Sequence, residues 1–243
     1  NEIHNILQRA NIKLTSYLSD IYGITGITLL EMFIDGEVIT EQTILPKIHG
    51  KVKATAAELV EAMDGKLSFE DRFLLGQSLE HYRHSVNQVE EITVVIKQYV
   101  LERFEREYNL LIELPGVSAI VACVILSEIG PNVEAFKSQG NLASWAGVCP
   151  GSYESAGIKK SSHTTQGNKY LKSILFQAGG TAGRSKDEAF HNLYARISGR
   201  SSKMKAIIAC AHKMIRVIYK ILSTGEHYDA KKALGLRQQA RAN

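Results

Sequence analysis

A heptad pattern of apolar residues constrains the fold of this 243-residue chain more than any other feature. Steps of four and three residues alternate without a break through Leu75, Leu79, Tyr82, Val86, Val89, Thr93, Ile96 and Val100. This spacing, held over about three and a half heptads, is typical of a coiled coil. It predicts a long helix that begins at Ser68 and carries the seam over residues 68–106. The pattern leaves the partner open: a helix of the same chain, a second copy, or the body of its own domain.

Helical periodicity continues through the rest of the chain, and no convincing strand pattern appears. We therefore expect a mainly α fold, with a long coiled-coil helix followed by a compact helical domain. The expected helices are 2–18, 25–33 closed by Gly36, 55–63 opened by a Thr55–Glu58 capping box, 168–184, one opened by a second capping box at Ser185–Glu188, and 204–222 ending before Gly225.

Charge divides the chain into two unlike parts. Residues 1–110 carry 11 Lys and Arg against 17 Asp and Glu, a net charge of −6, whereas residues 111–243 carry 18 against 8, a net charge of +10. A basic region is suited to binding a polyanion such as nucleic acid, although many soluble domains are basic without binding nucleic acid. We expect a helical linker and coiled-coil region over 1–110, a second domain over 111–228 and a flexible tail over 229–243.

A polar stretch from Ser152 to Lys169 carries most of the candidate chemistry. At about 18 residues it is longer than most loops in compact domains, and such loops tend to be functional. Ser155 is followed by Lys159, Lys160 and His163, and then by Lys169 and Lys172 at the start of a helix. A hydroxyl beside cations and a helix N-terminus can bind a phosphate group. The alternative is a solvated surface loop, in which His163 is an ordinary surface histidine.

Leu114 to Gly130 resembles one hairpin and the second helix of the helix-hairpin-helix motif of DNA-binding proteins. Gly116 permits a tight turn, and Ser118 follows at the start of an apolar helix. Backbone amides at such a helix start hold phosphates without reading sequence. Pro-Gly is also common in turns before helices of many kinds, so the pattern is only moderately specific for DNA binding.

Cysteine usage and hydropathy bear on the compartment. Cys123, Cys149 and Cys210 are odd in number and widely spaced, without zinc spacing or a disulfide framework, which favours a reducing cytoplasm. No apolar run approaches the roughly 20 residues that span a bilayer. The chain begins with Asn1 rather than Met, which favours a fragment or processed product.

Several motifs in fixed order together resemble a known family. The stretches LPGVSAIVACVILSEIG, NLASWAGVCPGSYESAG, KKSSHTTQGNKYLK and KMKAIIACAHKMIRVIYKIL resemble the C-terminal transposase domain of Piv/MooV-type transposases, the insertion-sequence-110 family. The resemblance covers most of residues 111–228. The first half, in RANIKLTSYLSDIYGITG and the seam around Leu79, resembles the coiled-coil region of the same family.

The resemblance implies a serine nucleophile within Tyr153-Glu154-Ser155-Ala156-Gly157, which places it at Ser155. Ala156 stands where the family commonly has glycine, and Ser152 is the next candidate, ahead of Ser161 and Ser162. Family members pair this domain with a RuvC-like domain whose Asp-Glu-Asp-Asp set binds Mg²⁺. That domain would precede residue 1, so we expect no cofactor in this chain, Mg²⁺ in the full-length enzyme, and no cleavage by the fragment alone.

The implied partners are DNA and a structured guide (bridge) RNA, in a homodimer or higher oligomer, with no membrane. The implied location is the bacterial or archaeal cytoplasm, associated with the nucleoid. Two other hypotheses stay open: a non-catalytic nucleic-acid-binding module of the helix-hairpin-helix type, and a coiled-coil dimerisation scaffold in which Ser155 is an ordinary loop hydroxyl.

Overall fold

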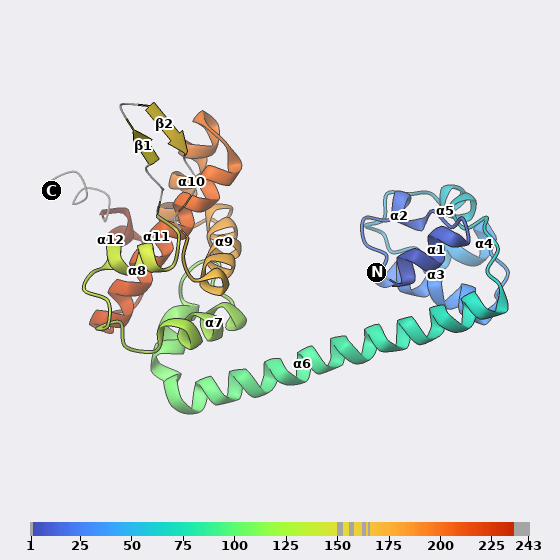
Figure 1. The fold of residues 1–243 in the computed structure, drawn as a ribbon, viewed down its shortest axis with the longest axis horizontal. Helices are drawn as coiled ribbons and strands as arrows, with labels where there is room; N and C mark the ends of the chain where they lie inside the picture. The colour runs from blue at the N-terminus through green and yellow to red at the C-terminus, as the bar shows by residue number, and fades with distance from the viewer. Residues whose placement is uncertain (1, 150–152, 156–157, 162–163, 165, 236–243) are drawn as a thin grey trace. The chain divides into compact units, whose positions relative to one another are not determined.

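The computed structural model describes residues 2–149, 153–155, 158–161, 164 and 166–235, with the backbone alone in the two strands. The described part is mainly helical, as the sequence predicts (Figure 1). The chain divides into two compact units, Asn1–Glu91 and Ile92–Asn243. The division lies inside the long helix α6 (Phe69–Ile112), whereas the sequence suggested a boundary between residues 110 and 111.

The first unit is a small helical body with its own apolar core. Its helices are α1 (Glu2–Arg9), α2 (Leu14–Tyr17), α3 (Ile24–Asp35), α4 (Glu41–Ile44), the 3-10 turn η1 (Leu45–Lys47), α5 (Ala56–Ala62) and the beginning of α6. The predicted capping box of α5 is present, with the Thr55 hydroxyl accepting from the Glu58 amide and the Glu58 carboxylate accepting from the Thr55 amide. Gly36 closes α3 in the left-handed conformation, as predicted.

The single helix predicted over residues 2–18 is wrong, because the chain breaks between α1 and α2. Asn11 takes a left-handed φ of 58°, a conformation that asparagine tolerates better than most residues. The turn is held by the Lys13 amide, which donates to the Ala62 carbonyl at 2.7 Å. Ile12 is buried in this turn, so the apolar spacing survives although the helix does not.

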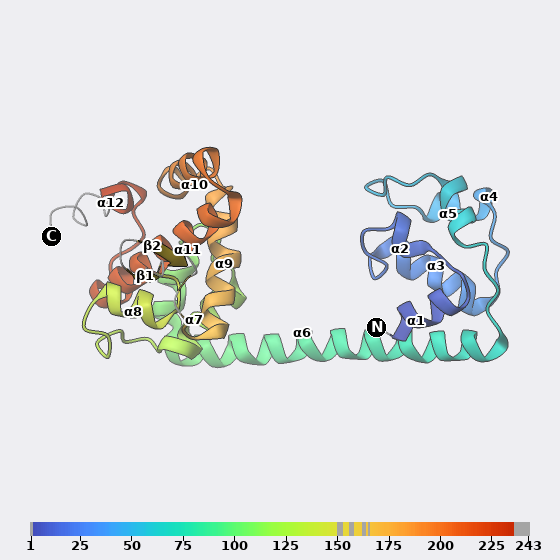
Figure 2. The same cartoon turned by 45° about the horizontal axis from the view of Figure 1, so that its top comes forward.

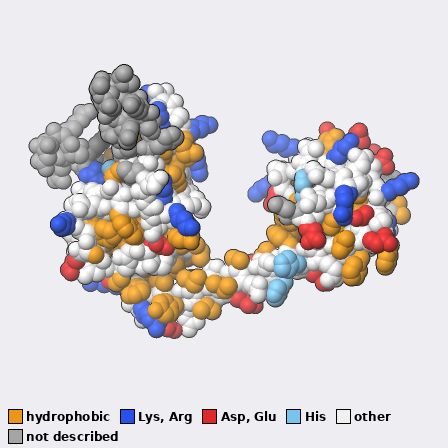
Figure 3. All heavy atoms as spheres, in the orientation of Figure 1, with side chains coloured by type: hydrophobic (Ala, Val, Ile, Leu, Met, Phe, Trp, Pro, Cys, Tyr) orange, Lys and Arg blue, Asp and Glu red, His pale blue; other side chains and the backbone are white. Residues whose placement is uncertain are grey.

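The two ends of the predicted seam on helix α6 pack against other residues of the same chain. Leu75 and Leu79 are buried in the core of the first unit, and Val100 is buried in the core of the second. The middle of the seam is exposed, with Val86 at 36%, Val89 at 64% and Ile96 at 44% of the residue's surface open to solvent. Figure 3 shows hydrophobic side chains on the surface of the long helix. Phe104 has non-helical angles (φ −139°, ψ 34°), so α6 is kinked there.

After α6, the second unit continues with helices that pack around a central one. These are α7 (Ala119–Ile129), α8 (Gln139–Trp145), α9 (Lys169–Gly183), α10 (Glu188–Arg200) and the central α11 (Lys203–Thr224), which lies beside α9 in both views (Figure 2). Gly179 brings α9 and α11 together, since a Cβ there would lie 2.7 Å from the Ala211 amide nitrogen. Gly225 closes α11 as predicted.

A two-stranded antiparallel hairpin lies in the stretch that the sequence predicted to be a loop without strands. Strand β1 (Tyr153–Ser155) pairs with β2 (Ile158–Ser161), with a register shift between Tyr153 and Glu154. Strands of three and four residues are too short to show an alternating pattern, which explains why the sequence did not reveal them.

Two local expectations in the second unit are also wrong. Helix α10 is capped by the Asp187 carboxylate, which accepts from the Phe190 amide at 3.1 Å, rather than by the predicted box at Ser185. The expected flexible tail contains a further helix, α12 (Ala230–Gly235), with Ala233 buried in the core. Residues 236–243 lie outside the described part. Within the described ranges, no helix combines the length and apolar character needed to cross a membrane.

Candidate nucleic-acid interface

The segment that contains the hairpin leaves and rejoins the helical body at one point. Gly147 has a φ of +70° at the end of α8, and Gly167 packs directly against it. A Cβ on Gly167 would lie 2.4 Å from the Gly147 nitrogen and 2.5 Å from the Trp145 carbonyl oxygen. Only glycine fits such a backbone contact, so the two ends of the segment 148–167 are joined at its base.

Asn168 fixes the point at which the segment re-enters the body. Its amide donates to the Trp145 carbonyl at 3.0 Å. Its side-chain oxygen accepts from the Tyr170 and Leu171 amides at 3.0 and 2.9 Å and caps α9. Its side-chain nitrogen donates to the half-buried Glu128 carboxylate of α7. Asn168 therefore joins α7 and the start of α9 through its side chain and the end of α8 through its backbone.

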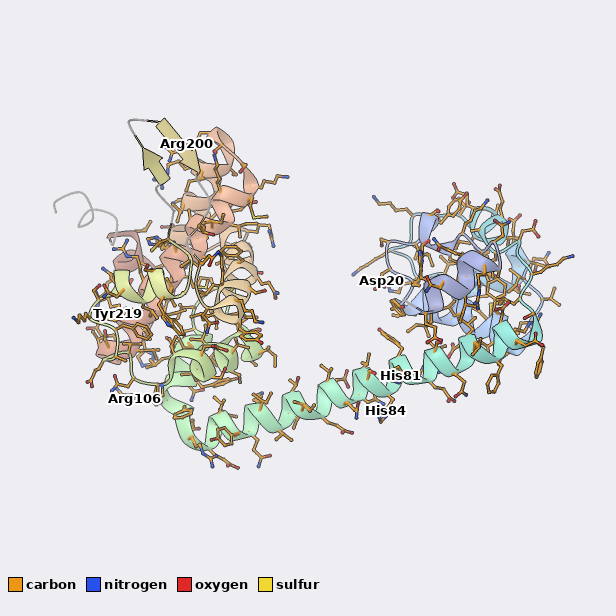
Figure 4. All side chains as sticks on the ribbon, in the orientation of Figure 1. Asp20, His81, His84, Arg106, Arg200 and Tyr219 are labelled. Carbon is orange, nitrogen blue, oxygen red and sulfur yellow. The ribbon has the colours of Figure 1, made fainter. Side chains whose placement is uncertain are left out.

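Phe136 links Trp145 to α11. The Tyr219 hydroxyl, labelled in Figure 4, donates to the Phe136 carbonyl at 3.2 Å. The Phe136 ring lies 5.4 Å from the Trp145 ring in a tilted arrangement. These contacts tie α8, and with it the base of the hairpin segment, to the central helix.

The hairpin places Ser155 at the end of its first strand. Ser155 is the last residue of β1 and pairs with Ile158, the first residue of β2. Lys159 pairs with Glu154, and Lys160 follows in the same strand. Ser161 ends β2, while Ser152, Ser162 and His163 lie outside the described residues.

Lys169 and Lys172 lie in the first turn of α9, as the sequence predicts. The Lys169 ammonium lies 4.9 Å from the centre of the Tyr170 ring, and that of Lys172 lies 6.0 Å from the Phe176 ring. No acidic residue occupies this turn. Cations at a helix N-terminus oppose the helix dipole, so an anion bound there would relieve an unfavourable interaction.

Gly116 and Ser118 form the turn before α7, and Gly116 has a packing role there. Its φ is +83°, and a Cβ would lie 2.3 Å from the Ala178 carbonyl oxygen, so the turn rests on the backbone of α9. The exposed Ser118 caps α7 by accepting from the Val121 amide at 3.4 Å. Gly116, which the motif predicts to be part of a phosphate-binding turn, brings the α7 turn onto the helix that begins at the hairpin segment.

Sequence reasoning missed Asn168 and Glu128, which position the segment. The signal for Asn168 was present, since Asn directly before a run with helical periodicity is a common N-cap. Nothing in the sequence indicates Glu128, because its partner lies 40 residues away along the chain.

The described residues contain no group of three or more His, Cys, Asp or Glu side chains that could hold a metal ion. The expected Mg²⁺ therefore has no ligand set in that part of the chain. Burial raises the pKa of Cys210 to about 11 and raises the pKa values of Cys123 and Cys149, so these thiols stay protonated at neutral pH.

Comparisons with known proteins match this region to transposases. Residues 108–195 match the model of the Transposase IS116/IS110/IS902 family. A putative transposase of Sinorhizobium fredii (strain NBRC 101917 / NGR234) is 31% identical over 157 residues, 61% of this chain and 39% of that protein. The pilin gene-inverting proteins of Moraxella lacunata and Moraxella bovis are each 27% identical over 158 residues, 63% of this chain and 48% of theirs.

The chain thus spans less than half the length of each of these relatives. The matched residues 108–195 include the α7 turn, the hairpin segment and the start of α9. The segment that carries Ser155 therefore lies within the residues that match the family model.

Proposed function

We propose that this chain is part of a DNA transposase and that its hairpin segment presents Ser155 to a phosphodiester of the DNA. The observation that carries the proposal is the match of residues 108–195 to a transposase family, since the match includes the hairpin and its helical base. The joined ends at Gly147 and Gly167 support it, because a nucleophile must be held close to its productive position.

The proposed reaction is a transesterification. The Ser155 Oγ attacks phosphorus, loses its proton to a base, and forms a phosphoserine ester as the bond from phosphorus to a sugar oxygen breaks. The released sugar oxygen takes up a proton. Attack of another sugar hydroxyl on the phosphoserine reverses these steps and joins new strands, so the bond energy is conserved.

A serine hydroxyl needs activation for such an attack. Mg²⁺ would supply charge stabilisation at the phosphate. The described residues offer no site for it, so in this proposal its carboxylate ligands lie outside them, in a RuvC-like domain of the same or a neighbouring subunit.

The charge of the second half supports binding to DNA and to a guide RNA. Residues 111–243 have a net charge of +10, and Lys169 and Lys172 lie at the positive end of α9. Neutralising backbone phosphates with such cations gives binding that weakens steeply as salt rises. Lys159 and Lys160 in β2, with His163 near them in sequence, belong to the same proposed surface.

The exposed middle of α6 supports a homodimer. Val86, Val89 and Ile96 keep heptad spacing while their side chains remain open to solvent. Covering apolar side chains is favourable by about 25 cal/mol per Å². A second copy of α6 would supply a matching apolar stripe, since the same residues recur on it.

The proposal is tested by replacing Ser155 with alanine in the full-length protein. We expect strand exchange to be lost while DNA binding is kept, and the covalent protein–DNA adduct to disappear from denaturing gels. Ser161→Ala, which removes a hydroxyl from the other strand, is the matched control and should keep the adduct. Full exchange by the Ser155 variant would rule out this nucleophile.

The two alternatives predict different outcomes in the same assays. A non-catalytic binding module would bind nucleic acid but form no adduct even with Ser155 present. A dimerisation scaffold would show no binding to nucleic acid at low salt. The isolated 243-residue chain is expected to bind DNA without cutting it in the presence of Mg²⁺.

A further inference from the structure

A groove of about 590 Å³ lies between α10 and α11 on the second unit. It is formed by one face of each helix, because its residues on each helix alternate steps of three and one, so that each lies three or four residues from another. The described residues that line it are Ala189, Asn192, Leu193 and Arg196 of α10, Lys205, Ile208, Ala209, His212, Lys213 and Arg216 of α11, and Val148, Thr164 and Leu234 from other segments.

The groove combines an apolar wall with cations. Leu193, Ile208 and Ala209 form apolar surface on facing helices. Its described lining also contains two lysines and two arginines but no carboxylate. Among the described residues, no Asp or Glu forms an ion pair with any of these four cations. The groove is therefore complementary to an anionic ligand with an apolar face.

Lys213 is held in place within this wall. Its ammonium donates to the Ala189 carbonyl at 2.8 Å and lies 5.5 Å from the centre of the Phe190 ring. Burial lowers the pKa of Lys213, and Asp187 opposes this effect from a distance. The Asp187 carboxylate is itself engaged by the Phe190 amide at 3.1 Å and the Tyr228 hydroxyl at 3.0 Å.

His212 adds a ring that is neutral at pH 7. Burial lowers its pKa, and the neighbouring Arg216 lowers it further. A neutral imidazole has one donor and one acceptor nitrogen, and its face is a surface on which a base can stack. Asn192, one of the polar residues on the facing helix, offers a donor and an acceptor of the kind that bind base edges.

The groove lies at the base of the segment that carries Ser155. Val148 and Thr164, which both line it, belong to that segment, near its beginning and its end. Cations continue beyond the groove along α10, where Arg200 follows Arg196 by one helical turn (Figure 4). A strand bound at Ser155 could therefore extend along positive charge into the groove.

From this geometry we infer that the groove between α10 and α11 binds one unstacked nucleotide of a single-stranded nucleic acid. The base lies against the apolar wall, and the flanking phosphates meet Arg196, Lys205 and Arg216. This inference deepens the proposed function and rests on it. The volume lies within the roughly 300–1,000 Å³ of ligand pockets. A base within a duplex cannot enter unless it is flipped out, so single strands and unpaired loops are the expected ligands.

The test uses the 243-residue chain and fluorescein-labelled dT12, rU12 and a 12-base-pair DNA duplex, with affinities measured by fluorescence anisotropy. Ala209→Phe fills the groove without changing charge. Arg196→Gln removes a cation from the groove, and Lys203→Gln removes one from the same surface outside it. Circular dichroism melting confirms that each variant is folded; if Ala209→Phe is not, Ala209→Leu replaces it.

We expect Ala209→Phe to weaken binding of the single strands by about tenfold or more, in line with one stacked base. Its affinity for the duplex should change by less than about twofold. Arg196→Gln should weaken single-strand binding more than Lys203→Gln does. A larger loss with dT12 than with rU12, or the reverse, identifies DNA or RNA as the source of the nucleotide.

Single-strand binding by Ala209→Phe equal to that of the unchanged chain would overturn the inference. A chain that binds duplex but neither single strand would also overturn it, while leaving the proposed transposase function intact. The Ser155 adduct assay reports on that function separately, because it measures covalent chemistry rather than equilibrium binding.

Discussion

The Asn168 side chain donates to the Glu128 carboxylate of α7 while its oxygen caps α9. Two residues 40 positions apart thereby fix where the hairpin segment returns to the helices. Substitution can separate the contact with Glu128 from the cap of α9, because only the contact with Glu128 needs the side-chain nitrogen of Asn168.

Asn168→Ser should keep the cap of α9 and lose the contact with Glu128, whereas Asn168→Ala should lose both. We expect the alanine variant to be less stable than the serine variant by about 1 kcal/mol, the usual contribution of an N-cap. Urea unfolding of the two variants measures the difference. Equal stability would show that the cap contributes nothing here.

Gly167→Ala should destabilise the second unit by about 1–3 kcal/mol, because the added methyl group must displace backbone rather than a flexible side chain. Gly199→Ala is the control, since Gly199 lies within α10 and nothing lies within 4 Å of an added Cβ. That variant should gain up to about 1 kcal/mol in helix propensity. Thermal melts of both variants test this, and similar stabilities for the two would contradict the packing at Gly167.

Val89→Glu should shift a dimer toward the monomer, because it places a charge on the exposed stripe of α6. Val94→Glu is a matched control, since Val94 is the same residue type, also 64% exposed, but off the heptad seam. Light scattering after size-exclusion chromatography gives the masses. If both variants keep the mass of the unchanged chain, α6 does not form the proposed interface.

Lys169→Gln should reduce the salt dependence of duplex binding. Each phosphate contact contributes a slope of about 0.9 in a plot of log affinity against log salt, so the slope should fall by about that amount. Lys53→Gln, on the exposed surface of the acidic first unit, should leave the slope unchanged. Anisotropy titrations between low and moderate salt provide both slopes, and an unchanged slope for Lys169→Gln would exclude a phosphate contact there.

Acid should weaken the link between the α7 turn and the segment after α11. Hydrogen bonding to His227, aided by the Tyr228 amide, lowers the pKa of Glu113 from its ordinary value of 4.5. A carboxyl group with a lowered folded-state pKa stabilises the fold above its ordinary pKa and loses this effect as pH falls through the lowered value. Glu113→Gln should therefore lose stability at pH 7, by less than about 1 kcal/mol because the pair is exposed, and the deficit should shrink as the pH falls below 4.5. A deficit that is constant with pH would contradict this origin.

Local signals of the sequence predicted much of the helical fold. The capping box at Thr55 and the closing glycines Gly36 and Gly225 depend on short-range chemistry, and the structure confirms them. Several motifs in order predicted a resemblance to insertion-sequence-110 transposases, and the match of residues 108–195 to the IS116/IS110/IS902 family model supports it.

The errors arose where distant contacts decide the local structure. Asn11 breaks a helix because Lys13 bonds to Ala62, which lies 49 positions away. The hairpin is only seven strand residues joined by a two-residue connection, below the length at which alternation is visible. The sequence does not indicate the groove between α10 and α11, because the cations that line it resemble the solubilising charge found on many helices.

The close approach of Gly147 and Gly167 has a consequence for how this protein can vary. Because Gly147 and Gly167 lie side by side in the helical body, changing the number of residues between them need not alter the path of any helix. Insertions, deletions or exchange with the corresponding segment of a relative should therefore be accepted there more readily than elsewhere in the second unit. Natural selection could reshape the chemistry of the residues between the two glycines while the helices stay the same.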